Sequence, residues 1–260
     1  MTELAANTLA AKTRGRGQPI VFLHGLGGSS ESWVPQLRTL GDHYHCIAPD
    51  LPGYGASPET TPMSLSAWAD ALARLFDAMK LDKVILVGHS LGGMLAQEFM
   101  IDHAARVSKL VLSCTSPAFG RKDGEFQKQF VSARLRKLEE GGTMRDVAEE
   151  ATPTLFSPAA SHEAVDSAIV TMWQVPEKTY RAALDCLVGF DRKEELTKIA
   201  VPTLLLSAEH DRAAPLIVME RMAEKIPHAR HVSMPGLGHL PNIEAPERFD
   251  HALTTFIKAV

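Results

Sequence analysis

The sequence predicts an α/β fold with a mostly parallel sheet flanked by helices. Short apolar runs recur between longer amphipathic stretches, and these runs lack the polar alternation of a strand with one solvated face. Runs of this kind are typical of strands buried on both faces, as in a parallel sheet covered by helices. The six clearest runs are Ile20–Leu23, Cys46–Ala48, Val84–Val87, Leu110–Leu112, Thr203–Leu206 and His231–Met234.

The flanking segments support the same architecture. Ahead of the first run, Leu9–Ala11 and the turn at Arg14–Gly17 predict a strand or hairpin that leads into the sheet. Between the third and fourth runs, Leu91–His103 is apolar at helical spacing and long enough for a right-handed crossover. Strand, helix and strand therefore follow one another in order.

An insertion at residues 117–198 interrupts this alternation, because no strand is convincing there and helical patterns dominate. We expect this insertion to form a helical cap over the carboxyl edge of the sheet. Residues 1–116 and 199–260 are expected to form the core. The clearest helices predicted from the insertion onward are Asp146–Glu150, Glu163–Trp173, Glu177–Phe190, Ala213–Ile226 and Pro246–Lys258.

Composition excludes several classes of protein. A hydrophobic content of 45% and a charged content of 22% indicate a globular chain with a sizeable core. The net charge of -4 is small, and no Lys/Arg cluster could follow a phosphate backbone, so no nucleic-acid partner is expected. No segment resembles a signal peptide or a membrane span, which predicts no membrane partner and a cytoplasmic location. Three widely spaced cysteines predict free thiols.

A Gly-x-Ser-x-Gly pentapeptide, Gly88–Gly92, lies between the run Val84–Val87 and the helix that starts near Leu91. On a strand-to-helix turn, this pentapeptide projects its serine above the sheet as a nucleophile. The alternative is a glycine-rich turn in which Ser90 only caps the helix. Because a serine hydroxyl alone is a poor nucleophile, the catalytic interpretation also requires a histidine and a carboxylate later in the chain.

Asp211 is the first candidate for the carboxylate that orients the base. It follows the run Thr203–Leu206, and the loops at the carboxyl ends of strands build the sites of open α/β sheets. Glu209, two residues nearer the strand, and Asp50, which follows the strand at Ile47, are the alternatives.

His239 is the candidate general base. It stands in the loop after the last run and before the final helix, and it follows Ser90 and Asp211 in the order that a serine triad of this type requires. His89 and His210 are neighbours of candidate residues, but we expect their side chains to point elsewhere.

The glycine-rich segment His24–Gly28, directly after the first run, is the fourth element of the candidate site. Backbone N–H groups of Leu26 and Leu91 are predicted to form an oxyanion hole. The segment contains neither a dinucleotide fingerprint nor a Walker lysine. His43-x-His45 lacks the clustered partners of a metal site, so no metal is expected.

With these residues placed, the chain resembles the α/β-hydrolase superfamily over nearly its whole length. The resemblance rests on three motifs in the order that the family uses, Phe22–Gly28, Pro49–Ser57 and Gly88–Gly93. Within the family, the chain is most similar to the small bacterial group of carboxylesterases and 3-oxoadipate enol-lactonases. The resemblance implies an eight-stranded sheet with one antiparallel strand, a cap after the sixth strand and no cofactor.

The predicted function is hydrolysis of a small carboxylic ester or lactone through an acyl-enzyme. The loop His24–Gly28 differs from the His-Gly-Gly-x-Gly loop often found in C–C bond hydrolases, which stay an alternative together with a non-catalytic ligand-binding protein. Epoxide hydrolases and haloalkane dehalogenases carry Asp in place of Ser90 and are disfavoured. Candidate pocket residues, which equally suit the interior of the insertion, are Phe130, Phe156, Met172 and Trp173.

Overall fold

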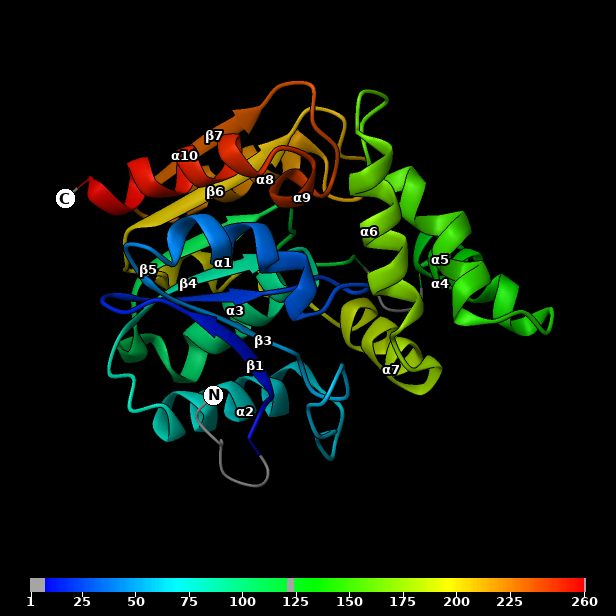
Figure 1. Cartoon of the computed structure of the whole chain (residues 1–260), viewed down its shortest axis with the longest axis horizontal. Helices are drawn as coiled ribbons and strands as arrows, with labels where there is room; N and C mark the ends of the chain where they lie inside the picture. Colours follow the sequence, from blue (N-terminus) through cyan, green and yellow to red (C-terminus); the bar gives the residue numbers. More distant parts are fainter. Residues whose placement is uncertain (1–7, 121–123, 260) are drawn as a thin grey trace.

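A seven-stranded sheet forms the centre of the computed structural model, which describes residues 8–120 and 124–259 (Figure 1). The strand order is β1-β3-β2-β4-β5-β6-β7, and only β1 runs antiparallel to its neighbour. The predicted α/β architecture is confirmed. The strands are β1 (Ala11–Arg14), β2 (Pro19–Leu23), β3 (His45–Pro49), β4 (Val84–His89), β5 (Val107–Ser113), β6 (Thr203–Ala208) and β7 (Ala229–Met234).

The expected count of eight strands is wrong for the described residues, which form seven. Ahead of β1, the N–H of Ala10 donates to Ser57 Oγ and its carbonyl accepts from the N–H of Asp50. The backbone of this segment is therefore bonded to the loop after β3 and not to a further strand. As a consequence the insertion follows β5, the fifth described strand, and not a sixth.

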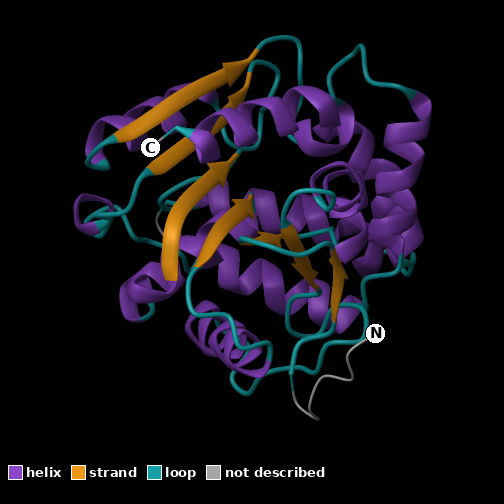
Figure 2. Ribbon diagram, turned by 60° about the vertical axis from the view of Figure 1, so that its left-hand side comes forward, coloured by secondary structure: helices purple, strands orange, loops and turns teal. Residues whose placement is uncertain are grey.

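Helices cover both faces of the sheet (Figure 2). Successive residues of a strand point to opposite faces, so Ile20 and Phe22 pack against α1 and α10. Val21 and Leu23 pack with α2, α3 and α8 on the other face. The helices of the core are α1 (Val34–Leu40), α2 (Leu65–Ala78), α3 (Leu91–Asp102), α8 (Leu216–Lys225), α9 (Pro241–Glu244) and α10 (Pro246–Lys258).

The insertion contributes four α-helices, which lie together at one end of the sheet (Figure 1). They are α4 (Glu125–Glu139), α5 (Met144–Ala151), α6 (His162–Trp173) and α7 (Glu177–Val188). Each helix predicted there occurs within a few residues of its expected bounds. Short 3₁₀ turns complete the described elements: η1 (Ser30–Trp33), η2 (Ala104–Arg106), η3 (Thr152–Leu155) and η4 (Leu196–Lys198).

The two ends of the insertion lie side by side. The N–H of Phe119 donates to the carbonyl of Phe190 at 3.0 Å, and the N–H of Arg192 donates to the carbonyl of Pro117 at 2.7 Å. The Arg192 guanidinium also binds both carboxylate oxygens of the buried Glu98 on α3, at 2.7 and 3.0 Å. The insertion thus leaves and re-enters the core at one anchored point.

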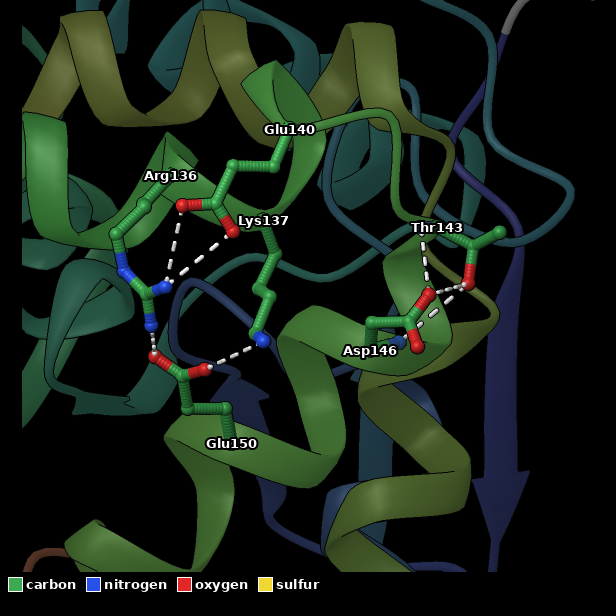
Figure 3. A network of polar contacts seen from close by, with 6 residues as sticks. All are labelled: Arg136, Lys137, Glu140, Thr143, Asp146 and Glu150. Atoms are coloured by element: carbon green, nitrogen blue, oxygen red, sulfur yellow. Dashed lines mark hydrogen bonds and ion pairs between the residues drawn. The ribbon is translucent and has the colours of Figure 1, made fainter.

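Ion pairs join α4 to α5 on the outside of the insertion (Figure 3). Arg136 binds Glu140 one turn along α4 and Glu150 on α5, and Lys137 reaches the same Glu150 at 3.4 Å. A capping box at Thr143–Asp146 starts α5. Because these groups are largely solvated, they orient the two helices without forming a buried core.

Candidate active site

Ser90 stands on a strained turn between β4 and α3, with φ 53° and ψ −118°. The turn requires glycine on both sides: a Cβ on Gly88 would lie 2.4 Å from the carbonyl oxygen of Gly92, and one on Gly92 would lie 2.3 Å from that of Leu23. Positive φ in a non-glycine residue is costly and needs support from its surroundings. The observed geometry is that of the predicted serine turn.

The structure brings Ser90, His239 and Asp211 together in one line of hydrogen bonds. Ser90 Oγ lies 3.0 Å from His239 Nε2, and His239 Nδ1 lies 2.8 Å from Asp211 Oδ2. Asp211 follows β6 and His239 follows β7, so both reach Ser90 from the carboxyl edge of the sheet. The Ser90 side chain makes no capping bond to α3, which argues against a merely capping role.

Asp211 is held as a carboxylate. Burial alone would raise its pKa, but the neighbouring His239 and the N–H groups of Ala213 and Ala214 lower the pKa below its usual value. Those two N–H groups donate to Oδ1 at 2.8 and 2.9 Å, which leaves Oδ2 for the histidine. An ionised, fixed acceptor favours the tautomer of His239 that carries its proton on Nδ1.

The two alternative acids are engaged elsewhere. Glu209 accepts a hydrogen bond from the N–H of Gly236 at 2.7 Å, and Asp50 accepts one from the N–H of Ser30 at 2.7 Å. Of the three candidate acids, Asp211 is the one that hydrogen-bonds the His239 ring.

The predicted oxyanion groups belong to segments that adjoin Ser90: Leu91 follows it in the chain, and a Cβ on Gly25, in the Leu26 loop, would lie 3.2 Å from the Ser90 Cβ. Leu91 is the first residue of α3, so its N–H is among those that have no acceptor within the helix. Leu26 lies in the loop after β2, and its carbonyl accepts the Tyr54 hydroxyl at 2.7 Å. This bond fixes the peptide orientation of the loop.

His24 also holds this loop in place, through hydrogen bonds of its ring. Its Nε2 accepts the N–H of Leu51 at 3.0 Å, which places the ring proton on Nδ1, 2.8 Å from the carbonyl of Gly25. Burial lowers the pKa of His24 to about 4. The ring is therefore neutral at physiological pH, and its two hydrogen bonds link the two loops.

His89 supports the histidine loop, contrary to the expectation that it points elsewhere. Its Nε2–H donates to the carbonyl of His239 at 2.7 Å. Burial, and then the charge of His239, lower the pKa of His89 to about 3. His210 is exposed at the rim of the cavity beside the triad.

Sequence reasoning also missed Glu244, which joins the histidine loop to the insertion. Its carboxylate accepts the N–H of Gly238 at 3.0 Å and the hydroxyl and N–H of Ser157. The contact is close, because a Cβ on Gly238 would lie 2.5 Å from the Leu155 carbonyl oxygen. The same carbonyl accepts the N–H of His239 at 2.6 Å. No local pattern signals these long-range backbone contacts.

A cavity of about 950 Å³ lies between the strand-end loops and the insertion. Phe130, Phe156 and Met172 are in its wall, together with Ser90. Trp173 is not among the lining residues: one residue along α6 turns the side chain about 100° away from Met172. Its ring lies 4.8 Å from the guanidinium carbon of Arg145 instead. The prediction of Trp173 as a pocket residue is therefore wrong.

One cluster of metal-ligating atoms occurs among the described residues, formed by Cys114, Asp211 and His239 within 4.8 Å of one another. The last two already bind each other in the line of hydrogen bonds from Ser90. All three cysteines of the chain are free thiols, as predicted. None of the described helices combines the length and hydrophobicity needed to cross a membrane.

Two relatives match this chain over most of its length. A putative carbamate hydrolase, RutD, from Caulobacter sp. (strain K31) is 30% identical over 249 residues, which cover 92% of this chain and 90% of the relative. A pimeloyl-(acyl-carrier protein) methyl ester esterase from Vibrio vulnificus (strain YJ016) is also 30% identical over 249 residues, covering 94% of this chain and 96% of the esterase.

Solved structures agree at the level of the fold. A thermophilic esterase from Thermogutta terrifontis, solved with malate bound, has a TM-score of 0.87 and 29% identity over 96% of this chain and 93% of that one. The enol-lactonase from Burkholderia xenovorans LB400, at 23% identity and a TM-score of 0.86 over 96% of each chain, shares the fold. Residues 18–246 match the family described as alpha/beta hydrolase fold, and the chain belongs to that family.

Proposed function

We propose that the protein is a serine hydrolase that cleaves a small carboxylic ester or lactone through an acyl-enzyme. The observation that carries this proposal is the line of hydrogen bonds from Ser90 through His239 to Asp211. Ser90, at one end of this line, is in the wall of the cavity. It stands on a strained turn, although its side chain does not cap α3. The esterase among the relatives makes an ester the first substrate class to test.

In the proposed mechanism, Ser90 Oγ attacks the carbonyl carbon while His239 Nε2 takes the hydroxyl proton. The N–H groups of Leu26 and Leu91 bind the oxyanion of the tetrahedral intermediate. His239 then gives the proton to the leaving alcohol oxygen, and the acyl group stays on Ser90. Water, deprotonated by His239, attacks the acyl-enzyme, and His239 then returns the proton to Ser90 Oγ as the carboxylic acid leaves. Asp211 keeps the imidazole oriented throughout.

We further propose that residues 117–198 act as a cap domain on a core of residues 1–116 and 199–260. The anchored ends at Pro117 and Arg192 and the joint cavity support this division. The cap would supply most of the apolar wall, including Phe130 and Met172, while the core would supply the reacting groups.

Short-chain aryl esters and a fluorophosphonate probe test the proposal directly. We expect the wild-type protein to turn over the esters and to be labelled at Ser90, and Ser90→Ala to lose both properties while its thermal unfolding is unchanged. Ser233→Ala, at an exposed serine of β7, is the matched control. Wild-type turnover by folded Ser90→Ala would contradict the triad. Absence of labelling in folded wild-type protein would instead favour a non-catalytic binding protein.

Lactones and vinylogous diketones extend the same assay to the other chemistries that this triad can serve. We expect esters or lactones to be cleaved faster than C–C substrates. A C–C substrate that is cleaved fastest would replace the ester assignment and leave the roles of Ser90, His239 and Asp211 intact.

A further inference from the structure

The wall of the cavity carries positively charged side chains. Its described lining residues include two arginines, Arg134 and Arg212, and no aspartate or glutamate. Arg212 is exposed next to the triad, on the core side, whereas Arg134 is half-buried on α4 of the insertion. A cavity lined by one sign of charge attracts a ligand of the opposite sign.

Arg134 differs from its neighbour on the same helix. Arg136 forms ion pairs with Glu140 and Glu150 on the outer surface (Figure 3). Arg134 has no carboxylate partner among the described residues, and its guanidinium carbon lies 5.1 Å from the centre of the Phe130 ring. Phe130 is one turn away on the same face of α4 and also lines the cavity. Arg134 thus presents an uncompensated cation at an apolar wall.

Tyr180 is a second polar residue of the cavity lining, near enough to Arg134 for the charge of Arg134 to act on its hydroxyl. This side chain on α7 lines the cavity and is fully buried, and its hydroxyl has no hydrogen-bond partner within residues 8–120 and 124–259. Burial raises the pKa of Tyr180 to about 12, and the charge of Arg134 partly offsets this rise. The hydroxyl therefore keeps its proton at neutral pH. An unsatisfied buried donor is costly unless a ligand completes its bond.

We propose that Arg134 and Tyr180 form a carboxylate-binding subsite, so that the preferred substrate is an ester or lactone with a second, free carboxylate away from the scissile carbonyl. This inference rests on the proposed function for its reacting end. The guanidinium supplies charge and paired donors, and the hydroxyl supplies one more. Ser90 and the subsite line one cavity, Ser90 from the core and the subsite from the insertion.

Paired substrates test the subsite. Monomethyl esters of succinate, glutarate and adipate are compared with methyl esters of the same chain lengths that lack the carboxylate, at pH 7. We expect the best acid monoester to exceed its neutral partner in kcat/KM. Arg134→Met and Tyr180→Phe should lower kcat/KM for acid monoesters by about ten- to a hundredfold and leave neutral esters within about twofold.

Matched variants separate the subsite from general effects. Arg136→Met removes an arginine from the same helix outside the cavity and should leave both substrate classes unchanged. Arg134→Lys should restore part of the preference, because it keeps the charge but not the planar donor pair. If Arg134→Met does not fold, Tyr180→Phe still provides the test, because it removes only a hydroxyl group.

Three results would overturn the inference: no preference for acid monoesters in wild-type protein, equal losses on both substrate classes in Arg134→Met, or a loss of preference in Arg212→Met in place of Arg134→Met. Failure of the proposed function can be distinguished from failure of the subsite, because wild-type protein would then hydrolyse neither acid monoesters nor neutral esters. In that case, calorimetric titration with glutarate still decides the matter: binding to wild-type protein that Arg134→Met weakens at least tenfold supports the subsite, and equal or absent binding overturns it.

Discussion

The core and the insertion use charged residues in opposite ways. In the core, Asp211 is 5% exposed and each oxygen of its carboxylate has a fixed partner. In the insertion, the side chains of Arg136 and Glu150 are 47% and 44% exposed and form a direct ion pair in contact with solvent. Buried polar groups are expensive to leave unpaired, whereas solvated pairs contribute little. We conclude that polar contacts in the core determine the geometry of the reacting groups, while α4 and α5 of the insertion depend on their ion pairs far less.

The largest expected effect comes from the core carboxylate. Asp211→Asn should lower kcat by about 10³–10⁴-fold, because the amide no longer favours the tautomer of His239 with its proton on Nδ1. Steady-state kinetics on an aryl ester measures the effect. Glu209→Gln, two residues away and bonded to Gly236, should stay within a few-fold of wild type. A larger loss in Glu209→Gln than in Asp211→Asn would transfer the role to Glu209.

The buried histidines of the core predict a pH-dependent stability. His24 and His89 have pKa values of about 4 and 3 in the folded protein, below the usual 6.5, so the unfolded chain binds protons more readily. Their contribution is complete above pH 6.5 and is lost as the pH falls toward 4. At pH 5 each should cost about 2 kcal/mol of unfolding free energy.

Urea unfolding at pH 7 and pH 5 checks this window. His24→Asn, which cannot be protonated, should lose about 2 kcal/mol less than wild type between the two pH values. His228→Asn, at an exposed position with positive φ that asparagine tolerates, should show the wild-type difference. The same pH dependence in His24→Asn and wild type would contradict the assignment of His24 as a neutral buried group.

A smaller effect is expected where the core and the insertion meet. Glu244→Gln keeps the shape of the side chain but removes the charge that binds Gly238 and Ser157. We expect kcat to fall about tenfold, because the histidine loop loses part of its support. Glu247→Gln, an exposed glutamate in the first turn of α10, is the control. Equal kcat values for the two variants would exclude a positioning role for Glu244.

The smallest effect is expected on the outer face of the insertion. Arg136→Gln should lower the midpoint of unfolding only slightly, because both of its ion pairs are solvated. Chemical denaturation at low and high salt measures this, and salt should narrow the difference further. A large fall of the midpoint would show that the insertion depends on its ion pairs as the core depends on its buried contacts.

The sequence predicted the residues of the core site more completely than the residues that hold the loops of this site in place. Ser90, Asp211 and His239 could be placed because each lies in the turn or loop that follows a strand, and parallel strands bring such positions to one edge. Glu244 and Tyr54 could not, because they bind backbone groups of other loops, at Gly238 and Leu26. A hydrogen bond to a peptide group requires no particular side chain on the partner residue, so the partner cannot be recognised in the sequence.

The insertion shows the other limit of sequence reasoning. Its helices were predicted from periodicity, but Met172 and Trp173 are neighbours with opposite surroundings, and only packing decides which one faces the cavity. In the core, α2 was not predicted. Leu65, Trp68 and Leu72 recur at helical spacing after the capping residue Ser64, and this pattern would have identified it.

The bond from the N–H of His239 to the carbonyl of Leu155 limits how freely the insertion can be exchanged between related proteins. A chimaera that imports a foreign insertion to change substrate range must reproduce the path of residues 155–157, or the base shifts with the graft. Gly238 has no room for a side chain to compensate. Diversification of this scaffold is therefore easier in α4 and α7 than in the segment that contacts the histidine loop.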